Sequence, residues 1–502
     1  MNLLFKLLLK GGAGFSPIAD PRFTLVGDSL TQFGNGLIPI NGTTLTRDAA
    51  GVVTVNKTAH QLFGSQPIYV MNVTDASYEA LSTSTYIDAN NFIYTTSVTG
   101  AAGSTTGEAL GQVIVQNRLT RNSFWSWLNS LLGGSARLNG NLGQGGDRLD
   151  QMNNAVAIAA ANAAEFVIMG GGINDINQAA SGATVTSRMQ THITTLLAAG
   201  KKVVLLAITP LGSTWPATSA KRIETQAANA GFATIAAANP NSVFYVDIYT
   251  PLADPAYSAT DGRAYSWVTS DGIHWGSRAA NAVAQAIQAV ITSKVIVSPI
   301  LPTSSGNLPT AAGFTAIKEY GAWSGTGGGF NGTNSTGTVQ PKLQIFAAAA
   351  TPTVNSLVDR GAGLGYWQQM LITPGGANNS VTAYIQANGG ESLASLGLTT
   401  SDTVYMAVEV SWSNGIAAGL LGFQLNCNLN NSGAEGYGRC GEYDGVPTFL
   451  DDSGTMTLIT GPVKLTGATT VVQSQVSTRV AAATANVLTW NIGRIVLYKK
   501  NP

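Results

Sequence analysis

The sequence is poor in charge, since Asp, Glu, Lys and Arg make up only 10% of its 502 residues and cancel to a formal net charge of zero. Lys and Arg nowhere form a run longer than two residues. A nucleic-acid-binding surface needs a basic stripe to neutralise phosphates, so that class of function is disfavoured. Gly, Ala, Thr, Ser and Asn replace the charged residues, a balance typical of β-rich extracellular or virion proteins.

Cysteine and histidine are also scarce, with two Cys and three His residues in the whole chain. So few candidate ligands make a Cys/His metal cage improbable, so no metal site is expected. Cys427 and Cys440 lie close together in the last third of the sequence. They can form one disulfide, but spacing alone does not decide whether they do.

No stretch of the sequence is long and apolar enough to span a membrane. Near the N-terminus, Lys6 and Lys10 interrupt an apolar run, and no Ala-x-Ala cleavage site follows. We therefore expect residues 1–20 to form a short amphipathic helix rather than a signal peptide. Such a helix would dock on the body of the protein or on a larger assembly.

From residue 21 to 297, short apolar runs alternate with Ala-rich segments of helical spacing. The chain is long enough for two or three domains, and this alternation predicts an α/β domain with a parallel sheet covered by helices on both faces. Working residues of such folds lie on loops at the carboxyl ends of strands. The expected strands are Phe23–Val26, Ala136–Leu142, Phe166–Met169, Val203–Ile208 and Val243–Ile248. The expected helices are Leu149–Ala161, Ser187–Ala198, Ala220–Ala238 and Ala279–Ile291.

Three segments depart from this alternation. Residues 42–118 are rich in Thr, Val, Tyr and Asn without helical periodicity, and predict a β-rich insertion between the first strand and its helix. Residues 298–309 are rich in Pro and Ser and indicate a linker. Residues 310–502 carry Gly-punctuated short strands and predict an all-β sandwich of jelly-roll type. Its clearest strands are Thr403–Val410, Leu420–Leu425, Val487–Trp490 and Ile495–Tyr498.

Acyl transfer by a serine needs a nucleophile, a base, an acid that orients the base, and donors for the oxyanion. The candidate nucleophile is Ser29, because Gly27-Asp28-Ser29-Leu30 ends the first predicted strand and places the hydroxyl on a turn. The alternative is that this motif only caps the next segment. Gly390-Glu391-Ser392-Leu393 is spelled similarly, but no apolar strand leads into it. The sequence has no Gly-x-Ser-x-Gly elbow, which argues against a lipase of the α/β-hydrolase kind.

The candidate base is His274, which lies in a loop just before the last helix of the α/β region. His60 falls in the β insertion and His192 on an amphipathic helix, and neither has an acid at a nearby loop position. Asp271, three residues before His274, can accept from one ring nitrogen and leave the other for Ser29. The alternative is a capping Asp beside an incidental His.

Two further loops offer oxyanion donors. Asn141–Asp147 is a Gly-rich turn after a strand, where the Gly146 N–H can approach a ligand closely. Gly172–Asp175 follows another strand, and Asn174 can offer its side-chain amide. Taken singly, each loop is as well explained by a glycine turn or an Asx turn.

Gly27–Leu30, Gly146-Asp147, Gly172–Asp175 and Asp271-x-x-His274 occur in this order, which resembles the four sequence blocks of the SGNH/GDSL hydrolase family. The resemblance covers about residues 20–295. It implies a flavodoxin-like α/β/α fold and ester hydrolysis without metal or cofactor. It also implies catalytic roles for Ser29, His274 and Asp271, and an oxyanion hole from Ser29, Gly146 and Asn174. The insertion departs from the family pattern, so substrate specificity does not carry over.

The substrate is suggested by the flanking segments. Residues 73–94 resemble a small β module of bacteriophage tail proteins, and residues 359–367 and 492–499 resemble jelly-roll-like domains that follow SGNH modules in phage tail and prophage proteins. Aromatic residues in the C-terminal half would stack on sugar rings if exposed, or fill the sandwich core. They are Tyr320, Trp323, Tyr366, Trp367, Trp412, Tyr437 and Tyr443.

These features predict an esterase that removes O-acetyl or similar short acyl groups from a bacterial surface polysaccharide. We expect it on the virion, as a phage tail protein, or outside the cell, with other tail proteins as partners. A homotrimer is an open alternative to a monomer, and no coiled-coil heptads indicate one. The rival hypotheses are a secreted bacterial esterase or lipase acting on lipids or small esters, and a receptor-binding or structural tail protein with a vestigial site.

Overall fold

A computed structural model of the chain describes most residues between 16 and 500, and the statements below concern those residues. They are 16–32, 35–40, 43–58, 60, 62, 66–71, 73–103, 112–119, 123–134, 136–212, 220–257, 262–269, 271–297, 301, 314–320, 325–341, 343–348, 351–361, 364–375, 379–385, 391–429, 435–441, 453–460, 463–465, 471–480 and 485–500. The docking helix expected in residues 1–20 and the linker expected at 298–309 lie, apart from residues 16–20 and 301, outside them.

The first domain is built on a five-stranded parallel sheet in the order β11-β2-β12-β13-β14. Each strand lies within two residues of an expected apolar run at both ends. This is the flavodoxin-like order, in which ligands bind where the winding of the sheet reverses, next to the first strand. The strands are β2 (Arg22–Gly27), β11 (Arg137–Gly143), β12 (Phe166–Met169), β13 (Lys202–Leu206) and β14 (Val243–Val246).

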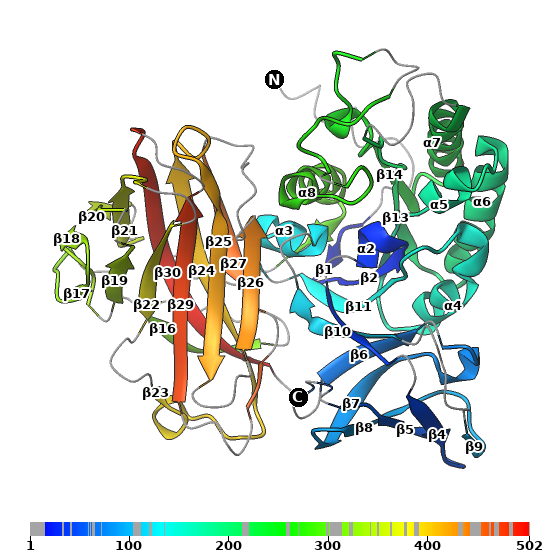
Figure 1. Ribbon diagram of the computed structural model, residues 1–502, viewed down its shortest axis with the longest axis horizontal. Coiled ribbons are helices and arrows are strands. Elements are labelled where there is room, and N and C mark those ends of the chain that lie inside the picture. The colour runs from blue at the N-terminus through cyan, green and yellow to red at the C-terminus, as the bar shows by residue number, and fades with distance from the viewer. Residues whose placement is uncertain are drawn as a thin grey trace, which may run out of the picture.

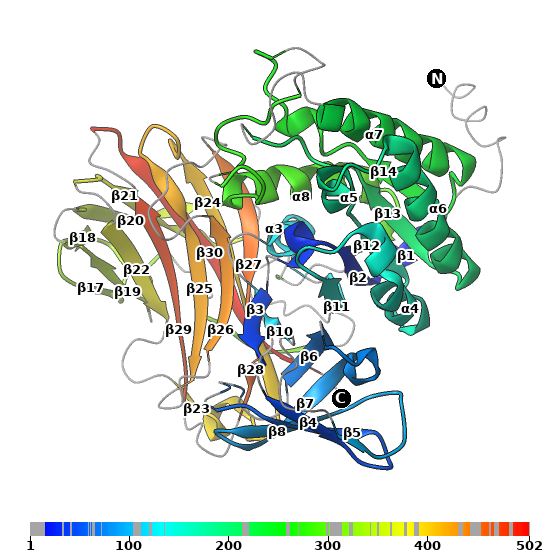
Figure 2. The same cartoon turned by 45° about the vertical axis from the view of Figure 1, so that its right-hand side comes forward.

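Helices cover both faces of this sheet (Figure 1). One face packs against α4, α6 and α7, and the other against α3 and α8, as Figure 2 shows from a second side. Strands buried on both faces need apolar residues at successive positions, and Val167 and Ile168 of β12 accordingly lie in opposite cores. The expected α/β/α hydrolase architecture is therefore present. The helices are α3 (Phe124–Leu131), α4 (Asn153–Ala161), α6 (Gly182–Ala198), α7 (Ala220–Ala238) and α8 (Ser277–Ile291).

Two boundaries differ from expectation. Strand β1 (Ile18–Ala19) pairs in parallel with β15 (Val295–Ile296), so the domain begins before residue 21. Strand β3 (Asn35–Pro39) pairs with β10 (Gln112–Leu119), so the inserted sheet begins before residue 42. A two-residue strand such as β1 is too short to show any periodicity in the sequence. The residue pair Asn41-Gly42, of a type that favours turns, lies after β3 in the sequence and so marks the start of the sheet too late.

The insertion forms an eight-stranded antiparallel sheet in the order β3-β10-β6-β7-β8-β5-β4-β9, beside the edge strand β11. Tyr69 and Met71 from this sheet share the core that includes Leu142 of β11. The insertion is therefore anchored in the first domain. Its remaining strands are β4 (Thr44–Arg47), β5 (Val52–Asn56), β6 (Gln66–Met71), β7 (Ala80–Asp88), β8 (Asn91–Thr95) and β9 (Ala102–Gly103).

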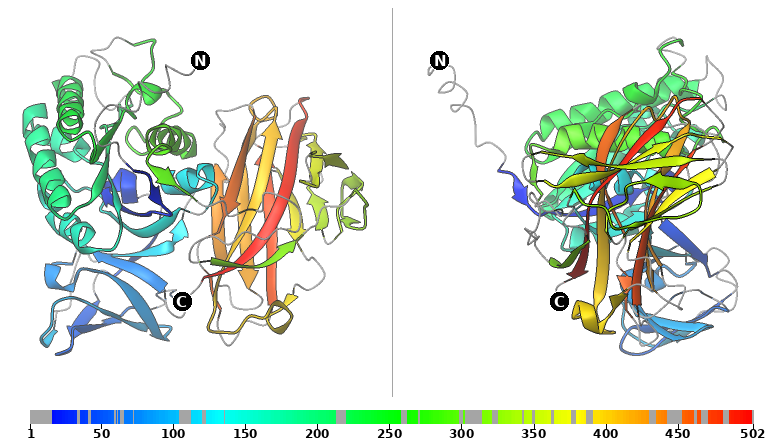
Figure 3. Two further views of the ribbon diagram at one scale, coloured as in Figure 1. Left: turned by 180° about the vertical axis from the view of Figure 1, so that it is seen from behind. Right: turned by 90° about the vertical axis from the view of Figure 1, so that its left-hand side faces the viewer.

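The last part of the chain forms two mostly antiparallel sheets that face each other (Figure 3). Met370 and Val408 from one sheet and Val381 and Phe423 from the other belong to one apolar core, so this part is an all-β sandwich. Its jelly-roll connectivity stays a prediction. One sheet contains β16 (Phe314–Tyr320), β18 (Ser335–Gly337), β20 (Thr353–Asp359), β21 (Tyr366–Ile372), β24 (Thr403–Ser413), β27 (Gly454–Ile459), β28 (Val463–Lys464) and β30 (Leu488–Lys500). The other contains β17 (Phe330–Asn331), β19 (Leu343–Ala347), β22 (Asn379–Ile385), β23 (Glu391–Ser392), β25 (Leu420–Leu429), β26 (Glu435–Gly441) and β29 (Val471–Val480).

One detail of the sandwich corrects the sequence interpretation, and a second answers the question that the cysteine spacing left open. The expected strands Val487–Trp490 and Ile495–Tyr498 are parts of one strand, β30, whose pairing with β24 shifts register between residues 408 and 410. The glycine between them therefore lies at a bulge, not at a turn. Cys427 is a buried free thiol, so it forms no disulfide with Cys440.

The aromatic residues of the sandwich are largely internal. Tyr320 and Trp412 are only 4% and 6% exposed, and Trp412 packs against Phe423 with ring centroids 5.3 Å apart. The alternative in which sugars stack on these two rings is therefore wrong, because the sandwich core already covers both rings. Tyr366 and Trp367 are half-buried. Trp323, Tyr443 and the side chain of Tyr437 lie outside the described residues.

The sandwich contacts the first domain through β26 and β27, which lie against α3 (Figure 1). Among the described helices, none is both long and apolar enough to cross a membrane.

Candidate active site

Ser29 lies where β2 ends and the short helix α2 (Ser29–Gln32) begins. The Asp28 carboxylate accepts from the Leu30 N–H at 3.0 Å, which tightens this turn. A Cβ on Gly27 would lie 2.1 Å from the Thr31 hydroxyl oxygen, so the turn needs glycine there. As the first residue of α2, Ser29 keeps a backbone N–H that the helix leaves unpaired.

His274 and Asp271 come from the loop that precedes α8. The His274 Nε2 lies 3.0 Å from the Ser29 Oγ, and its Nδ1 lies 2.6 Å from the Asp271 Oδ2. The imidazole thus bridges a hydroxyl and a carboxylate across 245 residues of sequence. This is the geometry that a general base needs to take a proton from serine while its other nitrogen is held in one tautomer.

The Asp271 carboxylate is itself fixed by several donors. Burial disfavours its charged form, but hydrogen bonds from the His274 ring, the His274 and Ile273 N–H groups and the Thr269 hydroxyl outweigh that cost and lower its pKa. Asp271 therefore stays ionised well below neutral pH and remains an acceptor for the imidazole.

The Gly-rich loop after β11 packs tightly on the turn that carries Ser29. The Gln144 N–H donates to the Gly27 carbonyl at 2.9 Å, and the Asn141 side-chain amide donates to the Thr31 carbonyl at 2.8 Å. A Cβ on Gly145 would lie 2.4 Å from the Gln32 amide oxygen. Only a glycine loop can approach this closely, and it carries Gly146, whose φ of +86° favours glycine. Within the described part of the chain, the Gly146 N–H has no hydrogen-bond partner.

Asn174 lies on α5 (Ile173–Asn177), directly after β12. Its side-chain amide donates to the Asp147 carbonyl at 2.9 Å, which ties this loop to the Gly-rich loop. An amide group carries two hydrogens, so the second remains for a ligand. The loops of Ser29, Gly146 and Asn174 are thus joined by hydrogen bonds at one edge of the sheet, each offering an N–H.

Two buried carboxyls adjoin these loops. Burial raises the pKa of Asp28 to about 6, although the hydrogen bond from the Leu30 N–H and the nearby His274 both act to lower it. Burial and the negative charge of Glu79 raise the pKa of Asp147 to about 7. Glu79 belongs to the insertion and accepts from the Asn154 side chain of α4 at 2.6 Å. The insertion therefore affects the electrostatics of the Gly146 loop.

We expect Asp28→Asn to flatten the pH dependence of stability. With a pKa of about 6 when folded and near 3.8 when unfolded, Asp28 binds its proton more tightly in the folded protein. Unfolding free energy therefore falls as pH rises between these values, by about 3 kcal/mol for a fully buried carboxyl. Asn keeps the oxygen that accepts from Leu30 and cannot ionise. Urea unfolding should show a gain for the variant that grows from about pH 4 to about pH 8; a gain independent of pH would contradict this.

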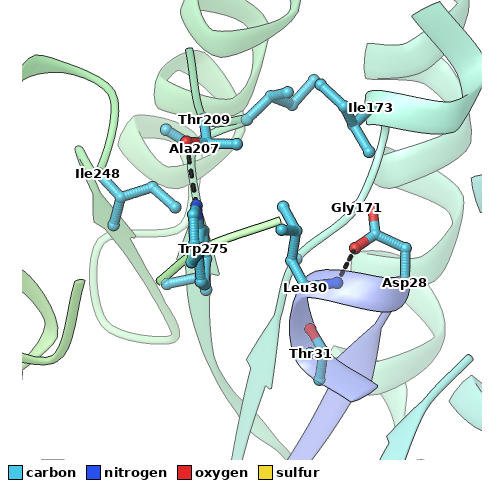
Figure 4. A pocket seen from close by; sticks show the side chains of 12 residues that line it. Asp28, Leu30, Thr31, Gly171, Ile173, Ala207, Thr209, Ile248 and Trp275 are labelled. Atoms are coloured by element: carbon cyan, nitrogen blue, oxygen red, sulfur yellow. Dashed lines mark hydrogen bonds between the residues drawn. The ribbon is translucent and has the colours of Figure 1, made fainter. Parts of the chain in front are cut away.

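A pocket lies beside the Ser29 turn, at the carboxyl ends of β12 and β13 (Figure 4). Leu30 and Trp275, the residues that follow Ser29 and His274, line it together with Ile173 and Ile248. The Trp275 indole N–H donates to the Thr209 hydroxyl at 3.2 Å and fixes the ring. The mostly apolar lining suits a small apolar group.

The other histidines have different roles. The His60 ring bonds to backbone oxygens of Asp88 and Asn91 within the insertion, and the His192 ring bonds to the Leu149 carbonyl. Among the described residues, no cluster of three His, Cys, Asp or Glu side chains has the arrangement of a metal site.

Ser29, His274 and Asp271 lie at the carboxyl edge of a parallel α/β/α sheet, in the arrangement that acyl transfer by a serine requires. Residues 96–280 match the model of the GDSL-like lipase/acylhydrolase family, so this part of the chain is similar to that family. The match includes Gly146, Asn174, Asp271 and His274, but it begins at residue 96, within the insertion, and so does not include Ser29. In the structure, Ser29 nevertheless lies next to the matched region, because its Oγ is 3.0 Å from the His274 Nε2.

Several solved structures are similar to parts of the chain. A lipolytic protein of the G-D-S-L family from Veillonella parvula has 21% identity, covering 33% of this chain and 87% of the other, with a TM-score of 0.27. A peptidoglycan O-acetylesterase has 11% identity, 53% and 89% coverage and a TM-score of 0.29. A variant of an acetyl-xylooligosaccharide esterase from Geobacillus Stearmophilus has 11% identity, 54% and 94% coverage and a TM-score of 0.30. No curated protein sequence matches the chain.

Proposed function

We propose that this protein is a serine esterase in which Ser29 is the nucleophile, His274 the base and Asp271 the residue that orients it. The observation that carries the proposal is the imidazole of His274, which bonds Ser29 at 3.0 Å and Asp271 at 2.6 Å. No second histidine in the described residues bridges a hydroxyl and a carboxylate in this way.

In the proposed mechanism His274 takes the Ser29 proton as the oxygen attacks the ester carbonyl. The N–H groups of Ser29, Gly146 and Asn174 stabilise the tetrahedral oxyanion, and protonated His274 then passes the proton to the leaving alcohol. Water, activated by the same imidazole, releases the acid from the acyl-serine. Loss of one such donor typically lowers the rate about 100- to 1000-fold.

The proposed substrate is a short acyl ester, foremost an O-acetyl group, on a bacterial surface polysaccharide. The loops that carry the candidate oxyanion donors and Asp271 bear the polar side chains of Gln144, Asn174 and Thr269, and polar groups at the rim of a small apolar pocket favour a short acyl group on a hydrophilic substrate. We further propose that the protein is a component of a phage tail. The part of the insertion that resembles tail-protein modules folds as a hairpin of β7 and β8, closed by the Tyr94 hydroxyl on the Tyr78 carbonyl at 2.7 Å.

Acetate release tests this substrate class. Purified protein should release acetate from acetylated capsule or O-antigen and leave long-chain acyl esters largely uncleaved. Efficient cleavage of long-chain esters without acetate release would favour the lipase alternative. Polysaccharide binding without hydrolysis of any ester would favour a receptor-binding protein with a vestigial site.

A further inference from the structure

The segment that follows Gly146 depends on side chains from elsewhere in the fold. It contains the Asp147 carbonyl, which holds Asn174, and then a single turn of 3-10 helix, η2 (Leu149–Gln151). If this segment moves, both the Gly146 N–H and the Asn174 amide move with it. What fixes the segment therefore fixes two of the three oxyanion donors in the proposed mechanism.

Asp175 holds the segment from one side. Its fully buried carboxylate accepts from the Leu149 N–H at 2.9 Å. Because Asn174 and Asp175 are adjacent, two consecutive side chains bind backbone atoms of residues 147 and 149. A movement of either loop breaks both bonds.

Helix α6 holds the same segment from outside the site. Arg188 and His192 lie one turn apart on this helix, on one face. The Arg188 guanidinium donates to Asp175 at 2.6 Å and forms an ion pair with Asp150 at 2.9 Å. Arg188 therefore holds two groups at once, as a clamp. One is the Asp175 carboxylate, which binds Leu149, and the other is the η2 turn, which it holds through Asp150.

His192 completes the clamp. It is 3% exposed, and its Nε2 lies 2.5 Å from the Leu149 carbonyl. A carbonyl only accepts, so this ring nitrogen carries the hydrogen. Burial lowers the pKa of His192, which favours a neutral ring with one N–H. Side chains thus bind both the N–H and the carbonyl of Leu149.

We infer that Arg188 and His192 are positioning residues, which hold the Gly146 loop and Asn174 in the geometry of an oxyanion hole. Both act through residues 147–151 and 175, and neither bonds to Ser29, His274 or Asp271. The inference rests on the proposed function, because it assigns a role in the same acyl transfer.

Hydrolysis of p-nitrophenyl acetate by matched variants tests the clamp, with kcat expressed per Ser29 titrated by diethyl p-nitrophenyl phosphate. Arg188→Met should lower kcat on the order of 10- to 100-fold and change KM little, since misplaced donors weaken transition-state binding. His192→Phe should do the same. His192→Gln, whose amide nitrogen can replace Nε2, should recover most of the loss.

Arg22→Met is the matched control. Arg22 also forms an ion pair, with Glu165 at 2.7 Å, and is similarly half-buried, but it lies at the opposite end of β2 from Ser29. The Arg22→Met variant should retain the kcat of the wild type. Equal kcat per titrated site in the Arg188→Met and Arg22→Met variants would overturn the inference and leave the proposed function intact. A wild-type protein that neither cleaves the ester nor reacts with the phosphate would overturn both.

Discussion

Ser29→Ala is expected to abolish ester hydrolysis, lowering kcat about 10,000-fold or more, while binding of the intact polysaccharide is retained. Alanine removes only the Ser29 oxygen that lies 3.0 Å from His274 Nε2, the oxygen that loses its proton in the proposed mechanism. Ser29 is only 9% exposed, and because alanine is smaller than serine it fits there without displacing its neighbours. The measurement is acetate release from polysaccharide or p-nitrophenyl acetate, paired with a binding assay on the same polymer.

Ser392→Ala is the control for this variant. Its surrounding sequence, Gly390–Leu393, is spelled like the Ser29 turn, but the Ser392 Oγ accepts from the Ser395 N–H at 3.1 Å in the sandwich and has no histidine partner. This variant should keep full activity. Equal hydrolysis by wild type and Ser29→Ala would show that the activity comes from another group.

Asp271→Asn is expected to lower kcat on the order of 1000-fold with the fold intact. The asparagine can still accept from the Ile273 and His274 N–H groups through its oxygen, but it offers an N–H where His274 Nδ1 needs an acceptor. The imidazole then loses its fixed tautomer, and the imidazolium formed during attack loses its counter-charge. Steady-state kinetics and thermal unfolding of the variant separate these effects from lost stability.

Asp247→Asn is a close structural match for this comparison. The Asp247 carboxylate accepts from the Tyr249 and Thr250 N–H groups and from the Thr250 hydroxyl, the same turn geometry without a histidine. Asp247→Asn should change kcat less than about twofold, since the carboxylate is exposed and bonds none of the candidate catalytic side chains. A similar loss in both variants would mean that Asp271 acts only by shaping its loop.

The sequence predicted the catalytic fold well because its signals are local. Buried parallel strands appear as short apolar runs, as Phe166–Met169 does without any error at its ends. The candidate residues Ser29, Gly146, Asn174, Asp271 and His274 follow strands or precede a helix, where parallel folds gather working side chains. The structure brings the first and last of these within 3.0 Å.

The sequence said less where tertiary contacts decide. The sequence left open whether Trp412 is exposed or fills the sandwich core, and the second sheet of the sandwich covers it. His192 showed only as a residue on an amphipathic helix, since its partner Leu149 lies 43 residues away. The spacing of Arg188 and His192 on one helix face was the available signal, but charge and histidine at helical spacing are common. The sequence analysis did not predict strand β3, because its partner β10 is distant in sequence.

Trapping of the acyl-enzyme tests the central claim most directly. The protein is mixed with p-nitrophenyl acetate, quenched in acid within the first turnover, digested and analysed by mass spectrometry. The account predicts that the peptide containing Ser29 gains the mass of one acetyl group, and that this adduct is absent in Ser29→Ala and strongly reduced in Asp271→Asn. Rapid hydrolysis with the acetyl group found on another residue, or an unchanged adduct in Ser29→Ala, would contradict it.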